Sequence, residues 1–152
     1  MQSHAQSAEK ELKKHCIISD NNKSAFKDMF KYAKKKHGFE YNLQPNGVEK
    51  DVSAKQIVKE IERNVVEGGV QSEYLPLDLW RLVYPQIGGG KGNLTLVGRN
   101  YLPIRDLFGI DSFAVITWKS AYNKWEIDLV DVSSGFVVKS SDRLFTVALV
   151  RQ

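Results

Sequence analysis

The first half of the chain carries apolar residues at the spacing of amphipathic helices. Segment 24–38 has them at positions i, i+3, i+4 and i+7, which predicts a helix with Ser24 as its N-cap and Gly38 just beyond its last turn. The lysines and the histidine near its end favour the carbonyl end of a helix. The apolar stripe consists of Phe26, Met29, Phe30 and Ala33.

Comparable spacing predicts helices on both sides of this segment. Residues 7–18 form one candidate, and residues 53–67 form another with Ser53 as its N-cap. A further short helix is expected to have Pro76 in its first turn and to stop near Pro85, because proline cannot continue a helix ladder.

Two segments rich in turn residues interrupt the helical pattern. Pro45-Asn46-Gly47 predicts that residues 39–51 form a loop. The second segment, Gly88-Gly89-Gly90-Lys91, suggests a phosphate-binding loop, but Pro85 stands where that motif needs its first glycine, and Gly92 where it needs a hydroxyl. The glycines also follow a predicted helix, whereas a P-loop precedes one. We interpret them as a helix stop and tight turn, and no cofactor is predicted.

The pattern becomes strand-like beyond residue 90. In the second run below, Trp125 and Ile127 alternate with Glu126 and Asp128, the period of a sheet with one wet face. Turn residues such as Asn123 separate the runs, so antiparallel hairpins are expected. The predicted strands lie at 112–118, 124–132, 135–139 and 143–150.

Helices followed by strands predict an α+β fold, with N-terminal helices packed on a C-terminal antiparallel β-meander. We expect residues 24–152 to form a single α+β domain, helical over 24–90 and β over 93–152, preceded by an N-terminal extension or short helix at 1–23. A chain of 152 residues is long enough to bury a core without disulfides.

Charge and composition narrow the classes of partner. The chain has 22 Lys and Arg against 18 Asp and Glu, a net charge of +4, so the excess is mild. Lysines cluster in residues 31–36, at the C-terminus of a predicted helix. Because cations are favoured at that end of a helix in any case, the cluster is weak evidence for a phosphate-binding surface. The sequence therefore predicts that nucleic acid is an unlikely partner. No apolar run approaches the length of a membrane span, so no membrane partner is expected.

The residues that could carry chemistry are dispersed. The one cysteine, Cys16, excludes an internal disulfide, and with His4, His15 and His37 confined to the N-terminal quarter, no metal site is predicted. His15 adjoins Cys16, but neighbours on a helix point about 100° apart, so a solvated histidine is the preferred interpretation. Carboxylates are available for acid–base chemistry, but Glu126 and Asp128 alternate with apolar residues and are expected on the solvated face of a strand. The available set is Asp106, Asp111, Glu126, Asp128 and Asp131.

Residues 73–90 resemble the DUSP domain of ubiquitin-specific proteases. The resemblance rests on two spacings, from Pro76 to Trp80 and from Trp80 to the glycines at 88–90. The family's apolar and aromatic positions around these residues are occupied by Leu75, Leu82, Tyr84 and Ile87. Upstream, AFKDMFKYAKKKHG looks like the family's early helix, and Pro45-Asn46-Gly47 is loosely similar to its Pro-Gly-Pro-Ile turn. The chain departs from the family at its early tryptophans, which are either replaced by Phe26 and Phe30 or missing, and at the proline after the glycines, which is Lys91. The resemblance implies a small α+β module for protein–protein contacts.

We therefore expect a non-catalytic protein–protein interaction domain, with another protein as partner and with no enzymatic activity of its own. The alternative is an exported bacterial protein, of a periplasmic binding or immunity-inhibitor type, because the start SHAQSAEKE could be a mature end. A small hydrolase that uses carboxylates is a third hypothesis. The first predicts a cytoplasmic location and the second a periplasmic or secreted one. The predicted partner surface comprises Tyr74, Trp80, Tyr84, Gly88, Gly89, Gly90, Lys91, Arg99 and Arg105.

Overall fold

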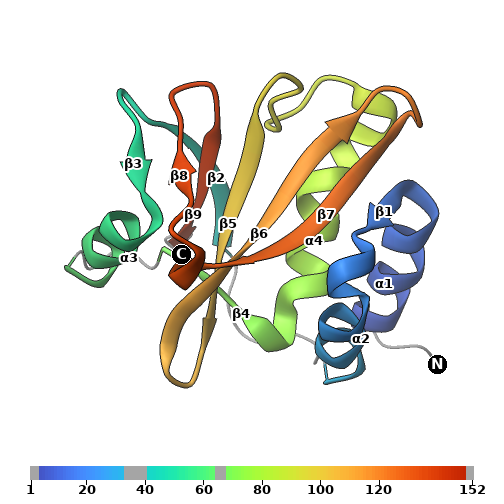
Figure 1. The fold of residues 1–152 in the computed structure, drawn as a ribbon. Helices are drawn as coiled ribbons and strands as arrows, with labels where there is room; N and C mark the ends of the chain where they lie inside the picture. Colours follow the sequence, from blue (N-terminus) through green and yellow to red (C-terminus); the bar gives the residue numbers. More distant parts are fainter. Residues whose placement is uncertain (1–3, 33–40, 64–67, 150–152) are drawn as a thin grey trace.

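A mixed seven-stranded sheet forms the centre of the molecule, with helices on both of its faces (Figure 1). The computed structural model describes residues 4–32, 41–63 and 68–149. The strands run in the order β1-β7-β6-β5-β9-β2, and β4 pairs with the end of β5 beyond β9. The sheet consists of β1 (Cys16–Ile18), β2 (Tyr41–Gly47), β4 (Val70–Gln71), β5 (Arg99–Asp106), β6 (Gly109–Lys119), β7 (Lys124–Asp131) and β9 (Arg143–Leu149).

Helices and a small second sheet complete the fold. The α-helices are α1 (His4–His15), α2 (Lys23–Tyr32), α3 (Ala54–Arg63) and α4 (Leu75–Val83). Short 3-10 helices are η1 (Asp20–Asn22), η2 (Ser72–Tyr74), η3 (Tyr84–Gly89) and η4 (Val132–Ser134). The second sheet pairs β3 (Val52–Ser53) with β8 (Val137–Val138) in antiparallel fashion.

Each face of the main sheet contributes to its own hydrophobic core. The larger core joins α1, α2 and α4 to one face and includes the fully buried Leu12, Leu79 and Trp125. The smaller core joins α3 to the other face, where Tyr101 stacks on Phe136 at 5.2 Å between ring centroids. Cover on both faces of the sheet explains why five consecutive residues of β5, 100–104, are buried instead of every second one.

The α+β class is confirmed, while the antiparallel meander is only part of the sheet. The β5–β6 and β6–β7 pairs are antiparallel, and the expected turn at Asn123 has a positive φ of 52°. However, β1 pairs with β7, β9 with β5 and β4 with β5 in parallel. The parallel pairs join segments far apart in the sequence, so no local pattern reports them. The N-terminal stretch contributes Leu12 to the larger core, as well as an edge strand.

Three local predictions are wrong in ways that tertiary contacts explain. The helix expected at 7–18 ends at His15, because Cys16–Ile18 joins the sheet edge beside β7. Helix α2 already begins at Lys23, so Ser24 lies inside it and is not its N-cap. The loop expected at 39–51 contains strand β2, in which Pro45 is tolerated because β2 is the outermost strand on its side.

Other local predictions are confirmed. The Ser53 hydroxyl accepts a hydrogen bond from the Gln56 N–H at 3.2 Å, which is the geometry of an N-cap for α3. Pro76 lies in the first turn of α4. The predicted end of the second helix at Gly38 and the end of the third near residue 67 lie outside the described residues.

Candidate functional site

Residues 84–98, which we call the pinned loop, connect α4 to β5. The segment begins as η3 and continues without regular structure to Gly98. Gly88 and Gly89 adopt left-handed φ values of 76° and 78°, and a Cβ at Gly89 would lie 2.8 Å from the Trp118 ring. The glycines are therefore required by backbone geometry and close packing.

The buried side chain of Gln86 links the first and last parts of the pinned loop by hydrogen bonds. This side chain is 2% exposed. The Gln86 Nε2 donates to the Leu94 carbonyl at 2.9 Å, and its Oε1 accepts from the Leu94 N–H. The Gln86 carbonyl in turn accepts from the Trp125 indole N–H at 2.9 Å. One buried residue thus ties both arms of the loop together and joins them to the sheet.

Two further buried side chains, those of Asn100 and Asp142, fix the C-terminal part of the pinned loop and the residue that follows it. The Asn100 Oδ1 accepts from the Thr95 N–H at 2.8 Å, and its Nδ2 donates to the carbonyls of Thr95 at 3.1 Å and Ile116 at 3.0 Å. Asp142 accepts from the Arg99 N–H at 2.8 Å and from the Lys139 N–H at 2.9 Å. Hydrogen bonds of this buried kind fix one loop conformation, because breaking them would leave polar groups without partners in the core.

The pinned loop displays apolar side chains to solvent. Val97 is 90% exposed and Tyr84 is 62% exposed, and Leu96 and Ile87 are partly accessible as well. The Tyr84 ring lies 5.2 Å from that of Trp80, one helical turn earlier. Isolated exposed apolar residues are ordinary, but four of them on one irregular, internally braced segment are typical of an interaction surface.

The structure places the predicted site residues in three regions. Tyr84, the three glycines and Lys91 lie on the pinned loop, and Arg99 follows it at the start of β5. Tyr74 lies before the first turn of α4, and the half-buried Trp80 contacts the rings of both Tyr84 and His15. Arg105 lies six residues beyond Arg99, about 20 Å along the strand. The pinned loop and the β5–β6 hairpin tip are therefore at opposite ends of β5 (Figure 1).

Sequence reasoning missed the residues that give this loop its properties. Leu96 and Val97 belong to a short stretch in which Leu94, Thr95 and Leu96 alternate as in a strand, so the sequence predicted β structure there and gave no sign of an exposed loop. Gln86 and Asn100 carry no such signal, because their role depends on partners brought together by the fold.

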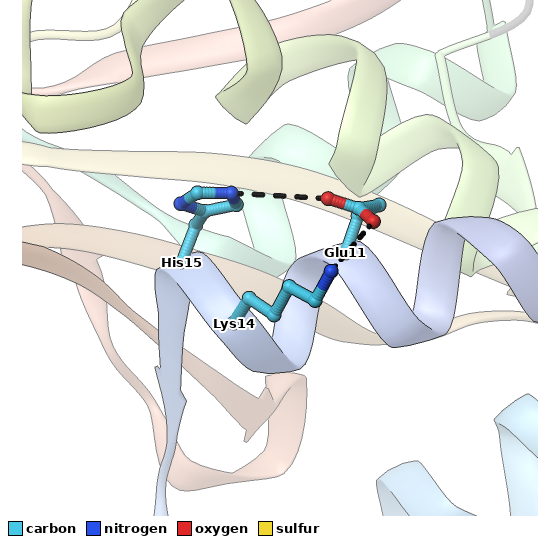
Figure 2. A network of polar contacts seen from close by, with 3 residues as sticks. All are labelled: Glu11, Lys14 and His15. Carbon is cyan, nitrogen blue, oxygen red and sulfur yellow. Dashed lines mark hydrogen bonds and ion pairs between the residues drawn. The ribbon is translucent and has the colours of Figure 1, made fainter.

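His15 and Cys16 do not form a thiol–imidazole pair. Figure 2 shows Glu11 on α1 flanked by Lys14 and His15, with Lys14 Nζ 3.3 Å and His15 Nε2 3.8 Å from the carboxylate oxygens. The His15 ring stacks on Trp80 at 6.0 Å, so this histidine is half-buried and not the solvated one expected. Cys16 points into the core, and burial raises the pKa of its thiol to about 12. Such a thiol stays neutral and unreactive near pH 7. His37 lies outside the described residues.

Burial of this thiol predicts a loss of stability in alkaline solution. The unfolded thiol ionises near pH 9, whereas the folded pKa is about 12, so the stabilisation is complete below pH 9 and declines as the pH rises toward 12. The expected slope is about 1.4 kcal/mol per pH unit. Burial also raises the pKa of Tyr101, which acts in the same direction.

Urea unfolding of the native chain and of Cys16→Ala, between pH 8 and 10.5, measures this slope. The difference in unfolding free energy between the two proteins should shrink as the pH rises. Two parallel curves would show that the thiol does not titrate differently in the folded state.

The available carboxylates fall into two groups, one around a cavity and one on β7. Asp106 and Asp111 line a cavity of about 280 Å³ together with Asp28 and Glu73. The Asp106 Oδ1 accepts from the Phe108 N–H at 2.7 Å and so holds the β5–β6 turn. Glu126 and Asp128 lie on β7, where Asp128 accepts from the Asn22 side chain. Among the residues that the structure describes, no group of three or more His, Cys, Asp or Glu is arranged to hold a metal ion.

Comparisons with protein-family models, with curated proteins and with solved structures found no match for this chain. Within the described ranges, none of the helices has the length and apolar character needed to cross a membrane.

Proposed function

We propose that this chain is a non-catalytic protein-interaction domain that contacts its partner through the pinned loop. The observation that carries the proposal is the contrast within residues 84–98: buried polar side chains fix the backbone, while Tyr84, Leu96 and Val97 face solvent. A loop already held in one conformation loses little entropy on binding. The exposed Tyr84 is of the residue type that often anchors protein interfaces, and the same loop exposes Leu96 and Val97.

Charges beside the loop indicate what the partner surface should look like. Lys91 is exposed on the loop, and Arg99 is exposed where β5 begins. A partner with an apolar centre and acidic residues around it would complement this arrangement. The part of the chain that resembles DUSP domains, residues 73–90, includes the first arm of the loop, and on that resemblance we propose a partner from the ubiquitin system.

The test is affinity purification with the full chain, identification of reproducible partners by mass spectrometry, and measurement of the dissociation constant for the strongest. Val97→Asp should weaken binding at least tenfold, or about 1.4 kcal/mol, because it places a charge at the centre of an apolar contact. Phe108→Asp is the matched control: Phe108 is 98% exposed, but it lies at the opposite end of β5. It should bind like the native chain.

Charge reversal provides a second matched pair. Arg99→Glu should slow association and alter its salt dependence, whereas Arg105→Glu, at the far end of the same strand, should do neither. Full binding by Val97→Asp would exclude the pinned loop as the interface, and loss of binding by Phe108→Asp alone would move the interface to the hairpin tip. A partner list containing secreted toxins or enzymes would favour an inhibitor role over the ubiquitin system.

A further inference from the structure

Helices α1 and α2 and the edge strand β1 lie beside one another (Figure 1). Residues of these three elements line a cavity of about 620 Å³. Its volume is within the range of small-molecule sites. We call it the lysine-rimmed groove. Its lining residues fall into an apolar set, Cys16, Ile18, Phe26 and Phe30, and a charged set, Glu9, Lys13, Lys23, Lys27 and Lys31.

The apolar set forms the deep part of this groove. Phe26, Phe30 and Cys16 are only 1%, 4% and 5% exposed, although they line the cavity. These three side chains therefore present little surface to the cavity, and the half-buried Ile18 is its more accessible apolar wall. The neutral Cys16 thiol adds to this apolar character.

The charged set makes the mouth of the groove positive. Four lysines line it against one carboxylate, that of Glu9. Lys13 pairs with Glu9 at 2.9 Å, and Lys23 with Asp20 at 2.6 Å. Within the described residues, Lys27 makes no ion pair. An apolar cavity with excess cations at its mouth is complementary to a ligand with a long apolar tail and an anionic head.

We propose that the lysine-rimmed groove binds a single-chain anionic amphiphile of the fatty-acid class. The carboxylate lies among the rim lysines, with Lys27 as its main partner. The alkyl chain lies against Ile18, above the buried Phe26 and Phe30. This site uses none of the pinned-loop residues, so it is independent of the proposed protein interface.

The test uses the full chain and a fluorescent fatty acid, 11-(dansylamino)undecanoic acid, whose emission rises in an apolar site. Dodecanoate below its micelle concentration should displace the probe. Dodecyltrimethylammonium, which has the same tail and opposite charge, should not, and neither should acetate. Affinity should rise about fourfold for each added methylene from octanoate to dodecanoate, because each methylene is buried in the groove.

Charge variants of two exposed lysines test whether the probe binds in the lysine-rimmed groove. Lys27→Glu should weaken probe binding about tenfold, and Lys27→Gln should weaken it less, because neutralisation removes attraction without adding repulsion. Lys59→Glu on α3 is the matched control, an exposed helical lysine in a helix packed on the opposite face of the sheet, and should bind like the native chain. Circular dichroism checks that each variant is folded.

Three results would overturn the proposal of a fatty-acid site. Equal displacement by the cationic amphiphile, or equal binding by Lys27→Glu, would overturn the proposal in favour of non-specific adsorption. Displacement by an acidic amphipathic peptide and not by dodecanoate would overturn it in favour of a peptide-binding groove.

Discussion

Replacing Trp125 by alanine should lower the free energy of unfolding by about 3–5 kcal/mol, the usual cost of removing a large buried aromatic side chain. Trp125 is fully buried in the larger core, where its ring lies 5.1 Å from that of Trp118. Its indole N–H also donates to the Gln86 carbonyl at 2.9 Å. The substitution therefore leaves a cavity and removes the hydrogen bond between the pinned loop and the sheet. Urea unfolding followed by circular dichroism measures the change.

A companion substitution separates the two contributions. Trp125→Phe keeps much of the packing but leaves the buried Gln86 carbonyl without the indole donor, which costs about 1–3 kcal/mol. Tyr122→Ala serves as the control, because Tyr122 is 68% exposed and its removal should change stability by less than about 0.5 kcal/mol. If Trp125→Ala were as stable as the control, Trp125 would not be the core residue that the structure shows.

Replacing Asn100 by leucine should cost about 3 kcal/mol, although the two side chains are similar in size. Asn100 is fully buried and makes hydrogen bonds to the N–H and carbonyl of Thr95 and to the carbonyl of Ile116. Leucine fills the space but satisfies none of these groups, and an unsatisfied buried group costs about 1–3 kcal/mol. The pinned loop should detach locally, so hydrogen exchange at the Thr95 amide should accelerate more than exchange within β6.

The matched control is Asn46→Leu. Asn46 is also a strand asparagine whose side chain donates to a threonine, Thr146, at 2.7 Å, but it lies exposed on the edge strand β2. Its replacement should cost well under 1 kcal/mol, since water can satisfy the groups it leaves. Equal losses for the two variants would contradict the role that we assign to Asn100 in bracing the loop.

Several elements could be predicted from the sequence because their causes are local. The β6–β7 hairpin follows from alternation in β7 and a turn at Asn123, both readable within a dozen residues. The start of α3 follows from Ser53, and the start of α4 from Pro76. In each case the residues that determine the structure are neighbours in the chain, so their spacing is enough.

Other elements depend on distant partners. Cys16 continues a helical spacing from Leu12, yet its backbone pairs with Trp125 on β7. Pro45 carries turn chemistry, yet β2 continues through it because β9 pairs with the same segment. A parallel or edge pairing is decided by which segments meet in space, and local propensity yields to the hydrogen bonds gained there.

The same distinction between local and distant causes applies to the candidate site. The sequence by itself determined an α+β class, a glycine turn after a short helix, and aromatic residues near that turn. Only the tertiary structure decided that Gln86, Asn100 and Asp142 lie beneath the turn, that Val97 lies on its outside, and that Arg105 is far from it. Solvent exposure and buried hydrogen bonds are relations between segments separated in the chain, and they come into existence only when the chain folds.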